Sequence, residues 1–237
     1  MADTQVWDDL SQYFNVHGDE IDPGAADNIL IAWPPMVIFL EENVTKGGSI
    51  LEYGCGTGGF AKKLASLGYT VKGMDPAPKM IEVAQKHLPQ IQFAVGDANA
   101  INADEKFDAI TGVMVFQFES NLTETFEKLA SHVNPGGCVV FAVFNPAWIV
   151  ECIQKGILFN GFDNPQALGK GTMDFGQGRA TDVYIRETVE YDEVMTNLGF
   201  RRLLEERPPY TVEFIEKYPT DQPTNVPEFL VLGYKKA

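Results

Sequence analysis

Apolar and polar residues alternate with two different periods along the first 144 positions of the chain. Short apolar runs, typical of strands buried on both faces, occur at 49–53, 70–74, 91–95, 107–115 and 138–144. Stretches with helical spacing lie between or before them, at 36–44, 60–67, 78–88 and 122–133. Glycine or proline follows several of these stretches, as at Gly68 and Pro89, and the segment Asn-Pro-Gly-Gly at 134–137 predicts a turn before the strand at 138–144. This alternation predicts a doubly wound, mostly parallel α/β sheet of the Rossmann-like kind.

The second half of the chain has a different pattern. Residues 145–187 form a long connection rich in glycine, and links of such length are usually functional lids or disordered. A helix over 188–198, a strand over 200–206 and a last strand over 229–234 complete the expected elements. Two final strands after a helix predict an antiparallel β-hairpin that ends a seven-stranded sheet. We expect one domain over 1–237, with a cap segment at 1–33 and a substrate lid at 145–187.

A glycine-rich turn follows the first predicted strand. Gly54, Gly56 and Gly58 alternate in the segment Ile-Leu-Glu-Tyr-Gly-Cys-Gly-Thr-Gly-Gly-Phe, and Glu52 stands two positions before the first of them. Alternating glycines let the backbone approach a ligand closely, and the amides at the start of the next helix point into the turn. The segment therefore predicts a nucleotide-type site at the carboxyl ends of the strands.

Two classes of nucleotide fit these glycines. Gly54, Gly56 and Gly59 also satisfy the G-x-G-x-x-G dinucleotide pattern, with Asp75 about twenty residues on, where a ribose-binding acid belongs. Glu52 would repel the diphosphate of a dinucleotide, whereas S-adenosylmethionine has no phosphate and carries a sulfonium and an ammonium group. An acid at this position therefore favours S-adenosylmethionine over NAD(P).

The stretch Glu-Tyr-Gly-Cys-Gly-Thr-Gly at 52–58 closely resembles the first motif of class I S-adenosylmethionine-dependent methyltransferases of the small-molecule type. The resemblance covers roughly residues 35–144, and more loosely 186–207 and 228–235. It implies that a set of residues at the strand ends contacts the cofactor: Glu52, Tyr53, Gly54, Cys55, Gly56, Gly58, Asp75, Pro76, Met80, Asp97, Ala98 and Val113.

The resemblance also implies individual roles. In this family the acid that ends strand two binds both ribose hydroxyls, and Asp75 stands there. Met80 corresponds to the apolar residue that flanks the adenine, and Asp97-Ala98 to the turn that meets the adenine amino group. Ala77 departs from the family, which often has a serine at that place as a helix cap.

Composition narrows the partners and the compartment. The 237 residues carry a formal net charge of −15, which disfavours binding to nucleic acid or to an anionic membrane surface. The three cysteines show no metal-binding spacing with the three histidines, so we expect no metal, and their sparse use suits a reducing cytosol. The acidic N-terminus has no signal region. We expect a soluble, cytoplasmic protein that acts on a small molecule; its oligomeric state stays open.

The acceptor side of the site is less defined. Methyl transfer needs a general base only where the attacking atom is protonated, and two residues are candidates for a catalytic role: Gln117, where relatives often have histidine, and His17 in the N-terminal segment. The residues that we expect to line the substrate pocket are Trp33, Gln117, Trp148, Tyr184 and Arg186. Trp33 and Trp148 are as compatible with a core position as with the pocket.

The leading hypothesis is transfer of a methyl group from S-adenosylmethionine to an oxygen, nitrogen or carbon atom of a small molecule, mainly through proximity and orientation. The alternative is a nicotinamide-dependent oxidoreductase that uses the same glycine loop. A third possibility is a cofactor-binding regulator without chemistry.

Overall fold

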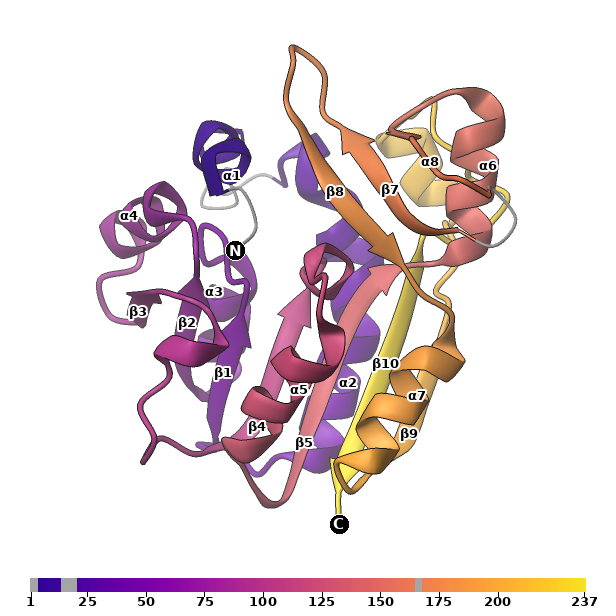
Figure 1. Cartoon of the computed structure of the whole chain (residues 1–237). Helices are drawn as coiled ribbons and strands as arrows, with labels where there is room; N and C mark the ends of the chain where they lie inside the picture. Colours follow the sequence, from indigo (N-terminus) through magenta and orange to yellow (C-terminus); the bar gives the residue numbers. More distant parts are fainter. Residues whose placement is uncertain (1–3, 14–20, 165–167) are drawn as a thin grey trace.

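The computed structural model describes residues 4–13, 21–164 and 168–237, and its central element is a seven-stranded sheet in the order β3-β2-β1-β4-β5-β10-β9 (Figure 1). Its strands are β1 (Ser49–Tyr53), β2 (Thr70–Asp75), β3 (Gln92–Val95), β4 (Phe107–Val113), β5 (Val133–Phe144), β9 (Phe200–Glu206) and β10 (Phe229–Lys236). β1 to β5 pair in parallel, whereas β10 pairs antiparallel with both β5 and β9. The predicted doubly wound sheet with a terminal antiparallel pair is confirmed.

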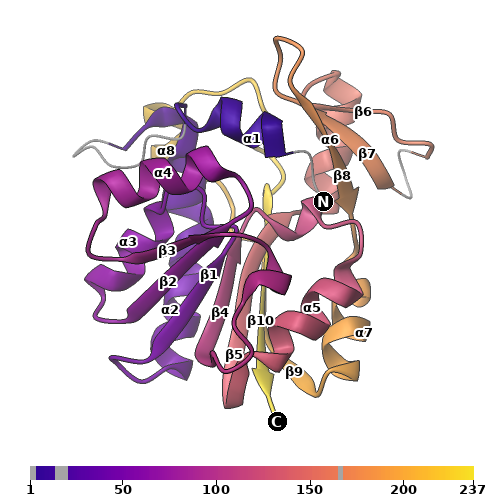
Figure 2. The same cartoon turned by 60° about the vertical axis from the view of Figure 1, so that its left-hand side comes forward.

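Helices cover both faces of the sheet, as the views from two sides show (Figures 1 and 2). One face carries α2 (Trp33–Asn43), α3 (Gly59–Ser66) and α4 (Pro78–His87), and the other carries α5 (Leu122–Ser131) and α7 (Thr188–Asn197). The alternation of side chains along β1 explains the two layers: Ile50 packs in the core of the α2 face, while Leu51 and Tyr53 pack in the core of the α5 face. All three are nearly inaccessible, as expected for a parallel strand buried on both sides.

Strand five begins earlier than the sequence indicates. We expected it to start at Cys138 after a turn at 134–137, but β5 begins at Val133, and its register against β4 shifts in this region. The Asn134 side-chain amide donates to Asp108 Oδ1 at 2.8 Å, so the expected turn is held along the start of β4. A local turn preference is overridden here by a contact with a residue 26 positions away.

Residues 145–187 are not a plain connection. They contain α6 (Pro146–Lys155) and a second, three-stranded antiparallel sheet of β6 (Phe159–Asn160), β7 (Gly169–Asp174) and β8 (Ala180–Ile185). This part has its own apolar core, in which Trp148, Phe159 and Val183 are buried together with Phe144 at the end of β5. The segment is therefore a folded layer, and the β7–β8 hairpin projects beyond the main sheet (Figure 1).

Several short elements had no clear period in the sequence. They are α1 (Thr4–Leu10), the 3₁₀ turn η1 (Pro23–Ala25), the π-helical η2 (Asn28–Ala32), the 3₁₀ turns η3 (Ala98–Ala100) and η4 (Phe116–Phe118), and α8 (Val212–Lys217). Within the described ranges, no helix has the length and apolarity needed to cross a membrane.

Asp108 gives a test of the sheet's amino-terminal edge. Its Oδ2 accepts from the Ser49 amide at 2.8 Å and the Ser49 hydroxyl at 3.1 Å, while Oδ1 accepts from Asn134. These hydrogen bonds lower the pKa of Asp108, so its stabilising effect is present above the pKa of the unfolded chain and is lost as the pH falls through the lower native value. Asp108→Ala should reduce the free energy of unfolding by about 1–2 kcal/mol at neutral pH, and by less in acid.

Urea unfolding at several pH values checks this prediction. Asp104→Ala, at an exposed position of the nearby loop, is the matched control and should change little. A difference between wild type and Asp108→Ala that is the same in acid as at neutral pH would contradict the assigned role.

Candidate active site

The glycine turn between β1 and α3 is packed on one side and open on the other. Gly54, Gly56 and Gly58 all have positive φ, of +68°, +51° and +85°. A β-carbon on Gly54 would lie 2.4 Å from Val115 Cγ2, whereas one on Gly56 would meet only Met80 Sδ, at 3.9 Å. The turn is thus wedged against the residues after β4 at Gly54, and at Gly56 it presents bare backbone to open space beside Met80.

Asp75, at the end of β2, is fixed by two backbone amides. The Gly56 amide donates to Oδ2 at 2.9 Å and the Ala77 amide donates to Oδ1 at 2.9 Å. Burial raises the pKa of Asp75, and the two amides offset part of that rise. Each carboxylate oxygen can accept a further hydrogen bond, so this geometry suits a ligand with two adjacent hydroxyls, such as a ribose.

Glu52 lies below the glycine turn with an unpaired oxygen. It is 2 % exposed, and its Oε2 has no hydrogen-bond partner. Burial raises the pKa of Glu52 well above its usual range; the Ala61 amide lowers it and nearby Asp75 raises it further. Two acids therefore stand close together with little water around them, and a positively charged ligand in the turn would compensate their charge.

The residues expected around the adenine lie on the same side of the turn. Met80 is buried with Ala77 under α1, and Asp97 caps η3 by accepting from the Asn99 amide at 2.9 Å. Ala98 packs in the same core cluster as Tyr53. Cys55 is buried and its amide donates to Met74 O at 3.0 Å, which ties the turn to β2.

The residues after β4 form the other wall. Val113 pairs with Ala142 of β5, and Met114 has φ +54°, a left-handed conformation that is uncommon without glycine. This backbone turns the chain into η4, which carries Gln117. Strain of this kind is concentrated at functional sites, but no pattern in the sequence indicated it at Met114.

Gln117 is 1 % exposed, and neither its amide oxygen nor its amide nitrogen has a hydrogen-bond partner among the described residues. An unpaired buried amide costs about 1–3 kcal/mol, and each such group needs an explanation. The sequence singled out this position, and the structure adds that its polar atoms are unoccupied.

Arg186, expected in the pocket, holds η4 in place. Its guanidinium donates to the carbonyl oxygens of Phe116 at 3.2 Å and Glu119 at 2.6 Å. Tyr184 packs beside it, with its ring centroid 5.5 Å from Arg186 Cζ. These contacts support a positioning role for Arg186, through the segment that carries Gln117.

The two tryptophans differ in their surroundings. Trp148 is fully buried, stacks on Phe144 and donates from Nε1 to Pro223 O at 3.0 Å, so the structure gives no support to its expected place in a pocket. Trp33 is half-buried against Phe60, with an unpaired Nε1. His17 falls within 14–20, outside the described residues.

Helix α1 spans the two sides of the site, between α4 and the β7–β8 hairpin (Figure 2). The Lys79 amide, in the first turn of α4, donates to Asp8 Oδ1 at 2.8 Å. On the other side, the centroid of the Trp7 ring lies 4.7 Å from that of Phe118 and 5.5 Å from that of Phe175. The only signal for this in the sequence is the helical spacing of Val6 and Leu10, which both pack near Met80. Elsewhere in the described chain, no group of three His, Cys, Asp or Glu could hold a metal ion.

Comparison with known proteins agrees with this geometry. Residues 50–137, which run from the glycine turn to the start of β5, match the family described as "Methyltransferase domain". Over these residues the chain is similar to a methyltransferase domain. This similarity favours a methyltransferase over the nicotinamide-dependent alternative.

Two curated relatives are similar over part of the chain. It is 28% identical over 153 residues to a ubiquinone biosynthesis O-methyltransferase of Coxiella burnetii, which covers 61% of this chain and 63% of that protein. It is 34% identical over 112 residues to a malonyl-[acyl-carrier protein] O-methyltransferase of Halalkalibacterium halodurans, covering 44% and 41%. The matches thus span less than two thirds of either relative.

Solved structures share the whole fold. An S-adenosylmethionine-dependent methyltransferase from Mesorhizobium loti superposes with a TM-score of 0.69 at 20% identity, covering 90% of this chain and 99% of that one. The N-methyltransferase NodS from Bradyrhizobium japonicum, solved with S-adenosyl-L-homocysteine, superposes with a TM-score of 0.62 at 15% identity over 98% of both chains. At these identities the likeness establishes the fold alone.

Glu52 gives a stability prediction. Because its pKa is raised in the folded protein, the native state holds this proton more tightly than the unfolded chain, and the stability of the wild type should fall relative to Glu52→Gln as the pH rises from about 5 to about 8. Urea unfolding without ligand measures the difference, with exposed Glu41→Gln on α2 as the control. Parallel stability curves for wild type and Glu52→Gln would show that no ionisation cost exists at this site.

Proposed function

We propose that this protein transfers a methyl group from S-adenosylmethionine to a small-molecule acceptor at the carboxyl edge of its sheet. The observation that carries the proposal is the Asp75 carboxylate, fixed by two amides beside the open backbone of Gly56. The match of residues 50–137 to a methyltransferase domain supports it independently, as do the names of the two curated relatives, both O-methyltransferases.

The residues present fit this cofactor. Asp75 would accept hydrogen bonds from the ribose hydroxyls, Met80 would flank the adenine, and Asp97-Ala98 would border its amino group. The unpaired Glu52 oxygen and the buried Asp75 charge favour a cation in the turn, and would oppose a diphosphate. Gly56 leaves the room that a β-carbon would fill.

The chain's part in the reaction is to bind and orient. S-adenosylmethionine supplies a methyl group that its sulfonium already activates. Holding an acceptor atom in line with such a group can supply about 7–11 kcal/mol of the barrier. The ring of Trp7 in α1 contacts the rings of Phe118 in η4 and Phe175 in the hairpin. We propose that these rings keep water from the reacting atoms.

Gln117 would position the acceptor. Its amide can donate to an oxygen or accept from an N–H or O–H, and both ends are free of protein partners. An amide does not titrate, so Gln117 would orient the acceptor and would not take its proton. We also propose that residues 1–33 form a cap and residues 145–187 a lid over the acceptor, because Trp7 of α1 contacts Phe175 of the β7–β8 hairpin.

Ligand binding tests the cofactor assignment. S-adenosylhomocysteine should raise the melting temperature, with about 2.7 kcal/mol of stabilisation at a hundred times its dissociation constant, and NADH should not. Asp75→Ala should weaken S-adenosylhomocysteine binding about ten- to a hundredfold in calorimetry, because charge-assisted hydrogen bonds are lost.

Asp104→Ala is the control for that experiment, since it removes an exposed acid from a loop at the other edge of the sheet. A shift with NADH alone, or unchanged affinity in Asp75→Ala, would overturn the assignment. Binding of S-adenosylhomocysteine without methyl transfer to any of a broad set of small-molecule acceptors would favour a regulator without chemistry.

Gln117 provides the matching test on the acceptor side. Gln117→Leu should lower kcat about tenfold or more with little effect on S-adenosylhomocysteine affinity, because an orienting contact with the acceptor is lost. The variant should also be as stable as the wild type or more so, since it removes an unpaired buried amide. Exposed Gln92→Leu on β3 is the control. An unchanged kcat would exclude Gln117 from the acceptor site.

A further inference from the structure

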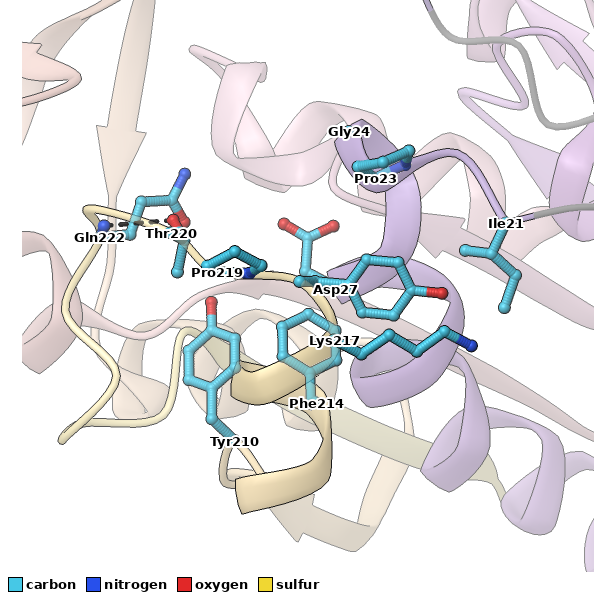
Figure 3. A pocket seen from close by; sticks show the side chains of 11 residues that line it. Ile21, Pro23, Gly24, Asp27, Tyr210, Phe214, Lys217, Pro219, Thr220 and Gln222 are labelled. Carbon is cyan, nitrogen blue, oxygen red and sulfur yellow. Dashed lines mark hydrogen bonds between the residues drawn. The ribbon is translucent and has the colours of Figure 1, made fainter.

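A second feature of the carboxyl edge is a cavity of about 930 Å³ between the η1–η2 segment and α8 (Figure 3). Segments nearly 200 residues apart in the sequence face each other across it: Pro23 and Asp27 from one side, Tyr210, Phe214 and Gln222 from the other. Its volume is in the range of sites for small organic ligands, about 300–1,000 Å³. None of the cofactor residues named above lines it.

Asp27 directs a carboxylate into this space (Figure 3). Its Oδ1 accepts from the amide nitrogen and the side-chain amide of Asn28, at 2.6 Å and 3.1 Å, while its Oδ2 accepts no hydrogen bond from the described residues. The wall thus presents one carboxylate oxygen that accepts no hydrogen bond from the described residues.

Glu228 adds a second acid beside the cavity. It is 4 % exposed, and the Tyr210 hydroxyl donates to its Oε2. Burial raises the pKa of Glu228 well above its usual range, and the charge of Asp27 raises it further. In the described part of the chain, no ion pair involves either acid.

Aromatic rings complete the wall. Three of the lining residues are aromatic: Tyr210, Phe214 and Tyr218. The Phe214 ring contacts each of the other two in a tilted arrangement, with a distance of 5.3 Å between ring centroids in both pairs. The one lysine among the lining residues, Lys217, has its ammonium 5.4 Å from the Tyr218 ring. Aromatic faces together with carboxylates that lack a counter-ion form the chemical environment that attracts an organic cation.

The cavity belongs to the same edge of the sheet as the glycine turn. Glu228 immediately precedes Phe229, which pairs with Phe144 at the carboxyl end of β5. The Glu228 carbonyl oxygen accepts a hydrogen bond from the Asn145 amide at 2.7 Å. Asp27 caps η2, which runs directly into Trp33 at the start of α2, where Trp33 packs on Phe60 at the start of α3. The cavity therefore lies at the same edge of the sheet as the cofactor turn and shares no lining residue with it.

We propose that this cavity binds an alkylammonium group of the methyl acceptor, held by the Asp27 carboxylate and the rings of Tyr210 and Phe214, with Glu228 behind Tyr210. The assignment of this cation to the methyl acceptor rests on the proposed function, whereas the cation site itself does not. It predicts that the small-molecule substrate carries a positive charge, whichever atom receives the methyl group.

Calorimetry with choline and its neutral isostere 3,3-dimethyl-1-butanol, each in the presence of saturating S-adenosylhomocysteine, tests the proposal. Choline should bind and the alcohol should bind at least about tenfold more weakly. Asp27→Asn should weaken choline binding about tenfold, while Glu216→Gln, an exposed position on α8 with the same change of charge, should leave it unchanged. S-adenosylhomocysteine affinity in the Asp27→Asn variant reports that it remains folded.

The outcomes separate the two proposals. Equal binding of choline and the alcohol, or no binding of choline, would overturn the cation site. Displacement of choline by S-adenosylhomocysteine would place the cation in the cofactor turn and overturn the acceptor assignment. Charge-selective binding of choline by a protein that does not bind S-adenosylhomocysteine would support the cation site and overturn the proposed function.

Discussion

The rest of the site depends on the carboxylate of Asp75 and the two amides that it accepts. β1 and β2 are neighbours in register, with Tyr53 opposite Met74, so the turns that follow them lie side by side. Asp75 joins these turns by binding the Gly56 amide of one and the Ala77 amide of the other. A buried carboxylate without such donors would be costly, and without the carboxylate the two amides would be unpaired. The shape of the glycine turn and the orientation of its acid are thus set by one another.

Buried carboxyl groups without an ion-pair partner among the described residues are the main electrostatic property of this edge. Glu52 and Asp75 lie under the glycine turn, Asp27 and Glu228 lie beside the neighbouring cavity, and burial raises the pKa of all four. Like charges in a region of low dielectric destabilise the free protein. Positive ligands would relieve that repulsion, which fits both a sulfonium cofactor in the turn and an ammonium group in the cavity.

The elements above the edge come from distant parts of the chain and interlock through few contacts. Trp7 of α1 meets Phe118 of η4 and Phe175 of the hairpin, and Arg186 at the end of β8 binds the carbonyl oxygens of η4. A movement of the hairpin would therefore reach Gln117 through Arg186. The second sheet and the segment that carries Gln117 are linked in this way.

The sequence by itself determined the central sheet and the cofactor turn, because their signals are local. Parallel strands buried on both faces are continuous apolar runs, glycine and proline mark their ends, and the motif at 52–58 needs neighbouring residues only. The substitution of alanine at position 77 also proved informative: the amide of Ala77 still binds Asp75, so the site keeps a contact that requires no side chain.

Only the tertiary structure decided the acceptor side, because each of its features depends on contacts between remote segments. Trp148 became a core residue through Phe159 and Pro223, and the expected turn at 134–137 joined β5 through Asp108. Local periodicity does not indicate that the buried Gln117 amide lacks a hydrogen-bond partner among the described residues. Nor does it indicate that Asp27 and Tyr210 line the same cavity. Patterns of hydrophobicity indicate which residues are buried, but they do not indicate which partner a buried polar group finds. At this edge, polar atoms of Glu52 and Gln117 are buried and find no partner among the described residues.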